Sequence, residues 1–198
     1  MGRRARAAAG AAVLGLSITV TALGASAASA AGPAVAPPPA AAAGESCWYA
    51  VDTGQSLCVT TGEDLVAAVA EEKGVRLIIP NGETVSGLKV DVRREAALAP
   101  AGLLASTAVS TIYDDNNYGG GSYTMSVSSG SCATTAFGFT DIGPLGWYNR
   151  VSSFKSYGGC KTALFSSTNY AGSSTGYSTS LSSVGSMNDL AKSWRVSG

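Results

Sequence analysis

The side chains that carry acid–base chemistry are sparse in this chain of 198 residues, which contains no histidine. Without histidine there is no Ser-His-Asp triad, no Cys-His pair and no zinc motif that includes histidine. Two carboxylates alone suffice for glycoside hydrolysis, but Asp114 and Asp115 are neighbours in a turn-like stretch. They are better suited to forming the turn or binding a cation. We therefore expect no enzymatic activity.

The oxygen atoms of this chain are better suited to binding a hard cation than to catalysis. Calcium takes six to eight oxygen ligands, and the carbonyl groups of tight loops are good donors. The acidic side chains beyond residue 110 are few and lie in polar, glycine-rich stretches: Asp114, Asp115, Asp141 and Asp189. These stretches are therefore candidates for calcium-binding loops.

One pattern occurs twice in the C-terminal part of the chain, over Tyr113–Ser122 and Phe165–Ser173. Each copy has an aromatic residue, four mostly polar residues, a tyrosine, one further residue and a glycine. A folded hairpin between the first two strands of a Greek key needs this pattern. Gly120 and Gly172 then stand where a close neighbour or a positive φ excludes a Cβ atom.

A second shared element follows each copy of the hairpin pattern. It is Tyr148–Ser153 after the first copy and Asn188–Ser193 after the second. Each leads into a short alternating stretch, Phe154–Tyr157 or Trp194–Val196, that is typical of a strand. The order of hairpin, loop and strand therefore occurs twice.

With these two elements, the chain from about Ser110 to Gly198 resembles a microbial βγ-crystallin domain. That family combines an aromatic-x4-aromatic-x-Gly hairpin with a loop of the form (Asn/Asp)-(Asn/Asp)-x-x-(Ser/Thr)-Ser. The resemblance implies a mainly β protein, with Greek keys at about 109–157 and 158–198 packed as a β-sandwich. Related secreted actinobacterial proteins include metalloproteinase inhibitors and killer-toxin-like proteins.

The resemblance also implies calcium ligands. In that family each site pools a hairpin carbonyl with loop oxygens from both motifs. Carried over by motif position, the hairpin carbonyls are those of Asn116 and Thr168, the loop carbonyls those of Arg150 and Leu190, and the hydroxyl that of Ser152. The remaining polar loop positions are Asn149, Asn188 and Asp189.

Two residues depart from the family loop. Tyr148 stands where the first loop should have Asn or Asp, and Lys192 replaces a hydroxyl ligand of the second loop with a cation. A fixed positive charge close to a divalent ion is unfavourable. We expect one site to be lost or very weak and the other to be degraded. The alternative, in which the loops serve only structure, stays open.

The first 31 residues are typical of a secretory signal peptide. Arg3, Arg4 and Arg6 precede an apolar run, Ala11–Leu23, and small-residue cleavage sites follow. We therefore expect a secreted, extracellular protein without a membrane anchor once this segment is removed. The remaining ten basic and thirteen acidic side chains form no basic block, which argues against a nucleic-acid partner.

The segment between the signal and the crystallin-like part is expected to have three sections. Residues 32–45 are rich in Ala and Pro and are predicted to be a disordered linker. Residues 46–95 predict a small hairpin–helix unit, and residues 96–108 a second linker with some helical character. The elements predicted in the unit are strands at Cys47–Val51 and Ser56–Val59, a helix at Thr61–Lys73 capped by Thr61, and a strand at Val75–Pro80.

The four cysteines are expected to form disulfides, because the chain is expected to be exported. Four cysteines allow three connectivities, of which we favour Cys47–Cys58 and Cys132–Cys160 because both pairings are local. A zinc or redox site is disfavoured, since no Cys-x-x-Cys spacing occurs.

Three functions are compatible with these observations. The first is a secreted, non-enzymatic βγ-crystallin-like module, monomeric and with one weak calcium site. The second is a peptidase inhibitor that binds an extracellular protease through an exposed loop, predicted at residues 137–147 and beginning with Phe137–Phe139, by analogy of fold alone. The third is a killer-toxin-like secreted protein.

Overall fold

The computed structural model describes residues 37–80 and 102–198. The predicted signal peptide and much of both predicted linkers lie outside these residues. The N-terminal elements are strands β1 (Glu45–Ala50) and β2 (Ser56–Thr60), helix α1 (Leu65–Lys73) and strand β3 (Val75–Ile78). No helix within the described residues is long and apolar enough to cross a membrane.

Two Greek keys follow the N-terminal elements. The first comprises β4 (Leu104–Tyr113), β5 (Ser122–Val127), β6 (Phe137–Phe139) and β7 (Ser153–Ser156), with a 3-10 turn, η2, at Asn116–Tyr118. The second comprises β8 (Lys161–Ser167), β9 (Ala171–Ser174), β10 (Ser180–Leu181) and β11 (Ser193–Ser197), with a 3-10 turn, η3, at Gly185–Met187.

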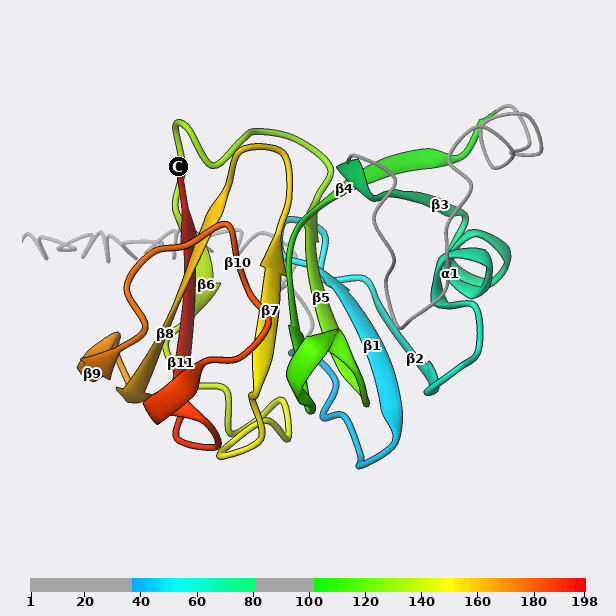
Figure 1. The fold of residues 1–198 in the computed structure, drawn as a ribbon. Helices are drawn as coiled ribbons and strands as arrows, with labels where there is room; N and C mark the ends of the chain where they lie inside the picture. The colour runs from blue at the N-terminus through cyan, green and yellow to red at the C-terminus, as the bar shows by residue number, and fades with distance from the viewer. Residues whose placement is uncertain (1–36, 81–101) are drawn as a thin grey trace, which may run out of the picture. The chain divides into compact units, whose positions relative to one another are not determined.

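Each Greek key lends its third strand to the sheet of the other. Strand β10 of the second key pairs with β7 of the first, and β6 of the first key pairs with β11 of the second. One sheet therefore contains the order β10-β7-β4-β5 and the other has the order β6-β11-β8-β9 (Figure 1). This arrangement confirms the predicted fold class, a mainly β protein with a Greek-key β-sandwich preceded by a small α+β segment.

The N-terminal strands extend the first sheet. Strand β1 lies parallel to β5, β2 lies antiparallel to β1, and β3 lies parallel to the first half of β4. A hairpin of this size has too little core to be stable alone. Its strands become part of a seven-stranded sheet instead.

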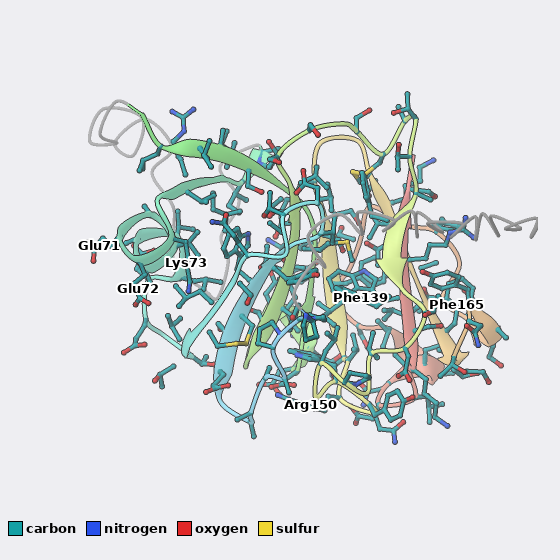
Figure 2. All side chains as sticks on the ribbon, turned by 180° about the vertical axis from the view of Figure 1, so that it is seen from behind. Glu71, Glu72, Lys73, Phe139, Arg150 and Phe165 are labelled. Atoms are coloured by element: carbon teal, nitrogen blue, oxygen red, sulfur yellow. A yellow bond between two sulfur atoms is a disulfide. The ribbon has the colours of Figure 1, made fainter. Side chains whose placement is uncertain are left out.

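The main hydrophobic core lies between the two sheets. Its large side chains include Tyr123, Trp147, Leu164 and Trp194, all fully buried. The ring of Phe139, on the exchanged strand β6, lies 5.7 Å from the ring of Tyr49, 6.3 Å from that of Tyr123 and 5.8 Å from that of Trp194, measured between centroids (Figure 2). The exchanged strand thus joins both keys and β1 in one core.

A second core packs helix α1 against the other face of the N-terminal strands. It contains Trp48, Val69 and Leu77, and it includes a hydrogen-bonded polar group. The indole Nε1 of Trp48 donates to Ser126 Oγ at 2.7 Å, and that oxygen lies 2.7 Å from Ser106 Oγ. These bonds satisfy buried polar atoms on a sheet face that is covered here.

Helix α1 begins later than the sequence predicts, at Leu65 instead of Thr61. Asp64 is the cap, because its Oδ1 accepts from the backbone N–H groups of Val66 and Ala67 at 3.1 and 3.0 Å. The carboxylate of Glu63 bonds back to the N–H of Thr60. The helix ends as predicted at Gly74, which has φ of +64°.

Three other expectations need correction. Residues 104–108, predicted to be linker, form the first half of β4, because residues 104–107 pair with β3 and Ala108 pairs with Ser126 of β5. Phe137–Phe139, predicted to be a loop, is strand β6. In the predicted disordered linker, Ala41 is buried in the main core, and its N–H donates to the carbonyl of Leu145 at 2.8 Å. Small side chains let this stretch of backbone approach the core closely.

The two predicted disulfides, Cys47–Cys58 and Cys132–Cys160, are both confirmed. The first joins the two strands of the N-terminal hairpin at directly paired positions. The second joins the segment before β6 to the residue before β8, and so links the two keys.

We predict that replacing Cys47 and Cys58 by serine lowers the free energy of unfolding of the whole described unit by about 3 kcal/mol. Unfolding should remain a single transition because β1 and β5 share a sheet. Guanidinium titrations followed by tryptophan fluorescence and by far-UV circular dichroism measure this, with the Cys132→Ser/Cys160→Ser variant as the comparison. Two transitions, the later one at the parent midpoint, would show that the hairpin is a separate folding unit.

Candidate functional site

The two hairpins of the repeated pattern have the same backbone conformation. We call residues 113–122 the first hairpin and residues 165–173 the second hairpin. Each has two consecutive residues in the left-handed region, Asn117 and Tyr118 in the first and Asn169 and Tyr170 in the second. The leading aromatic ring of each hairpin lies 5.8 Å from the ring of its tyrosine.

Gly120 and Gly172 have φ of +72° and +80°, as the pattern predicts. The atoms that a Cβ would meet belong to the hairpins themselves. A Cβ on Gly120 would lie 2.9 Å from atoms of Asp114 and Asp115, and one on Gly172 would lie 2.5 Å from Ser166 Oγ. The close packing of each folded-over hairpin therefore excludes a side chain at Gly120 and Gly172.

One buried serine fastens each hairpin to its loop. We call residues 148–153 the first loop and residues 188–193 the second loop. In the first, Ser153 Oγ accepts from the N–H of Tyr118 and donates to the carbonyl of Asp115. In the second, Ser193 Oγ accepts from the N–H of Tyr170 and donates to the carbonyl of Ser167. The last serine of each family-like loop thus has a structural role.

The two loops pair with each other in opposite directions. The N–H of Asn149 donates to the carbonyl of Ala191 at 3.3 Å, and the N–H of Asp189 donates to the carbonyl of Val151 at 3.2 Å. Antiparallel pairing places the end of each loop beside the start of the other. Ser152 therefore lies on the side of Asn188 and Asp189.

Combining this pairing with the serine bonds sorts the predicted ligands into two groups. At the first end, the first hairpin with Asn116 meets Ser152 and the Asn188–Leu190 stretch. At the second end, the second hairpin with Thr168 meets residue 192 and the 148–150 stretch, which includes Asn149 and Arg150. The loop pairing thus divides the predicted ligand positions between two ends.

Both departures from the family loop lie at the second end. We expected one site to be lost and the other degraded, with one departure in each loop. The antiparallel pairing instead places Tyr148 of the first loop beside Lys192 of the second. The first end keeps all its predicted ligand positions.

Tyr148 makes a structural contact at the second end. Its hydroxyl hydrogen-bonds to the carboxylate of Asp141, and its ring lies against Gly143, where a Cβ would come within 2.7 Å of it. Asp141 also accepts from the N–H of Gly143 at 2.8 Å. Hydrogen bonding from Tyr148 lowers the pKa of Asp141, and the same bond raises the pKa of Tyr148. This carboxylate is committed to the turn.

The two ends also differ in charge. The first hairpin contains Asp115 and Asp114, which is paired with Arg150, and the second loop places Asp189 at the first end. The second end has Lys192 and, over the ring of Tyr170 at 5.3 Å, Arg195. The fixed positive charges of Lys192 and Arg195 disfavour a divalent cation at the second end.

Two oxygen atoms at the first end have no hydrogen-bond partner among the described residues. Within residues 37–80 and 102–198, no hydrogen bond is made by Ser152 Oγ or by the carbonyl of Leu190. Asp189 accepts one hydrogen bond, from Asn188 Nδ2 to its Oδ2 at 2.7 Å. With the carbonyl of Asn116, the first end offers four oxygen donors from the first hairpin and the two loops, and a hard cation completes its shell with water. The donor set fits calcium.

The side chain of Arg150 has a role that the sequence analysis missed. We assigned only its carbonyl, yet its guanidinium forms a two-bond ion pair with Asp114 at 2.9 and 2.9 Å. It also lies 4.6 Å from the ring centre of Trp147. A lone arginine after Asn149 gives no sequence signal for these contacts, because its partners are 36 residues away or are main-chain atoms.

Residues 137–147, proposed as an inhibitory loop, turn inward. Ile142, Leu145 and Trp147 are fully buried and Phe137 and Phe139 are partly buried. An inhibitory loop presents its side chains to a protease. This stretch uses its bulky side chains for the core.

The described residues include one cluster with the spacing of a metal site, formed by Glu45, Cys47 and Cys58. Its two sulfur atoms are joined in a disulfide. Because only a thiolate ligates metal well, this cluster is not a metal site.

Exchanged third strands, folded hairpins and serine-fastened loops define a βγ-crystallin-like sandwich. Known structures with similarity to this chain include a βγ-crystallin domain from Flavobacterium johnsoniae, at 28% identity over 44% of this chain and 92% of that one, with a TM-score of 0.34. A βγ-crystallin domain from Clostridium beijerinckii has 22% identity over 45% and 97%, with a TM-score of 0.35. The N-terminal domain of protein S has 21% identity over 45% and 94%, with a TM-score of 0.36.

No family model matches the sequence, and no curated protein matches it. Similarity to microbial βγ-crystallin domains thus extends over about 45% of the chain. The fold of that part is established by the strand order and hydrogen bonds given above.

We predict that Tyr148→Phe raises the pKa of Asp141 towards its ordinary value, because the hydroxyl donor is removed. The folded-state pKa of Asp141 is depressed, so its contribution to stability is present above the unfolded-state pKa and is lost as pH falls through the folded-state pKa. The variant should lose part of that contribution. Carboxyl-carbon NMR titration measures the pKa, with Tyr177→Phe as the control. An unchanged Asp141 pKa in Tyr148→Phe would contradict the assigned bond.

Proposed function

We propose that this protein is a secreted, non-enzymatic βγ-crystallin-like module that binds one calcium ion at the first end of its paired loops. The observation that carries this proposal is the antiparallel pairing of the two loops, which places Ser152 on the side of Asp189 and Leu190, next to the hairpin of Asn116. The carbonyl, hydroxyl and carboxylate oxygens of these residues are hard donors of the kind that calcium takes.

The second end supports a structural role only. Lys192 supplies a positive charge where a hydroxyl ligand is needed, and Tyr148 is bonded to Asp141. The loops there still hold the second hairpin through Ser193. The two ends thus have the same loop-to-hairpin bonds, but only the first is proposed to bind an ion.

A protease-inhibitor function receives no support from the described residues, because residues 142–147 bury their large side chains. No observation favours a killer-toxin function over the calcium-binding module either. Secretion rests on the sequence of the first 31 residues and is part of the proposal.

Calcium titration by isothermal calorimetry tests the proposal directly. The parent should bind one ion, and Ser152→Ala should weaken binding because it removes one of the four protein donors. Ser186→Ala, an exposed serine in η3, is the matched control and should bind as the parent does. Binding that is equal in Ser152→Ala and the parent would contradict the assigned site.

A second pair of variants tests the asymmetry of the two ends. Lys192→Ser alone should not create a second binding event, because Tyr148 still occupies the second end. Combining it with Tyr148→Asn should create one. A second event in the single variant would show that Lys192 alone had closed that end.

A further inference from the structure

The stretch just before β1 is held against the first Greek key. We call residues 39–44 the N-terminal arm. The hydroxyl of Tyr123 donates to the carbonyl of Pro39 at 3.2 Å, and the N–H of Ala41 donates to the carbonyl of Leu145. Ala41 is only 5% exposed. The arm is therefore part of the packed unit, although its composition is that of a linker.

The guanidinium of Arg150 uses all five of its N–H donors, and two of these bonds hold the arm. Besides the two bonds to Asp114, Nη1 donates to the carbonyls of Ala41 at 3.1 Å and Gly146 at 2.8 Å, and Nη2 donates to that of Ala42 at 3.4 Å. A planar guanidinium presents five donors in fixed directions. A lysine ammonium has three donors on one atom and cannot make this set of bonds.

The first key carries a matching feature that the second lacks. The stretch from the turn-capping residue to the paired loop, Asp141–Asn149, is two residues longer than its counterpart Ser183–Asp189. It contains Gly146, at φ of +75°, where a Cβ would lie 2.5 Å from the carbonyl oxygen of Ala41. The arm packs against this longer stretch, and the absence of a side chain at Gly146 leaves room for the carbonyl of Ala41.

Arg150 is near one candidate ligand in the sequence and is linked to a second through its ion pair with Asp114. Arg150 precedes Ser152 by two residues, and its partner Asp114 precedes Asn116 by two residues. Ser152 and Asn116 both belong to the first end of the loops, whereas Arg150 itself lies in the 148–150 stretch at the second end. Figure 2 labels Arg150, which joins the arm, the first loop and the first hairpin.

We propose that Arg150 is a positioning residue that couples docking of the N-terminal arm to cation binding at the first end. This inference rests on the calcium site proposed above. The docked arm fixes the Arg150 side chain, and the Arg150–Asp114 pair fixes the spacing between the first loop and the first hairpin. A docked arm thus strengthens cation binding. By linkage, a bound cation strengthens arm docking by the same factor.

The charge of Arg150 acts in the opposite direction, since a cation nearby repels calcium. Its pairing with Asp114 reduces this effect. Arg150→Lys separates the two contributions, because it keeps the charge and loses the bonds to the arm. Arg195→Lys is the matched control. Arg195 also lies over an aromatic ring, on the second key, and has no bond to the arm.

The test uses the full chain and two measurements. The first is the rate at which elastase, which cuts after small residues, cleaves within residues 39–44, followed by mass spectrometry with and without calcium. The second is the calcium dissociation constant. For Arg150→Lys we expect arm cleavage without calcium to be about 10-fold faster and calcium binding about 5- to 10-fold weaker. Calcium should slow arm cleavage in the parent. Arg195→Lys should match the parent in both measurements.

Three results would overturn the coupling. If the parent binds calcium and Arg150→Lys binds it equally well, the site is real but the arm does not influence it. If calcium leaves arm cleavage in the parent unchanged, the reciprocal effect is missing and the coupling is wrong. If the parent binds no calcium, the proposed function itself fails and the coupling falls with it. The calcium-free cleavage rates would then show Arg150 as a structural clamp alone.

Discussion

The antiparallel pairing of the two loops is the interaction on which the rest of this structure depends. Two backbone bonds, from Asn149 to Ala191 and from Asp189 to Val151, fix the loops against each other. Ser153 and Ser193 then bind each loop to its hairpin. The same bonds that close the sandwich therefore also decide which oxygen atoms meet at each end.

The two loops and their hairpins have matching hydrogen bonds, but their two ends carry different side chains. At the second end, Lys192 and the bond between Tyr148 and Asp141 replace the features of a cation site. At the first end the ligand positions remain, and the first hairpin is tied to the N-terminal arm through Asp114 and Arg150. The backbone tolerates both changes because the loop pairing joins main-chain atoms and the serine bonds are made by Ser153 and Ser193, which are not the substituted residues.

The fold was predictable where the signal is local. The spacing of Tyr113, Tyr118 and Gly120 predicts a folded hairpin. The short sequence separation within each cysteine pair favoured the two disulfides that the structure contains. The end of α1 was marked by Gly74, but its start was misplaced because Asp64 competes with Thr61 as a cap. Local patterns thus fixed the types of elements more securely than their bounds.

The sequence suggested the candidate ligand residues, but it did not show which of them lie at the same end of the paired loops. Tyr148 and Lys192 are visible as departures in the sequence, but their proximity depends on pairing between loops about 40 residues apart. The arm was missed for a related reason. Arg150 holds it through the carbonyls of Ala41 and Ala42, and a carbonyl is present at every residue.

Anomalous diffraction from crystals of the full chain soaked in a calcium-like lanthanide tests the central claim, that the loop pairing leaves one cation site. The account predicts one peak at the first end, within coordination distance of Ser152 Oγ and the Asn116 carbonyl, and none beside Lys192. A peak at the second end, near Thr168 and Lys192, or two equal peaks, would contradict it.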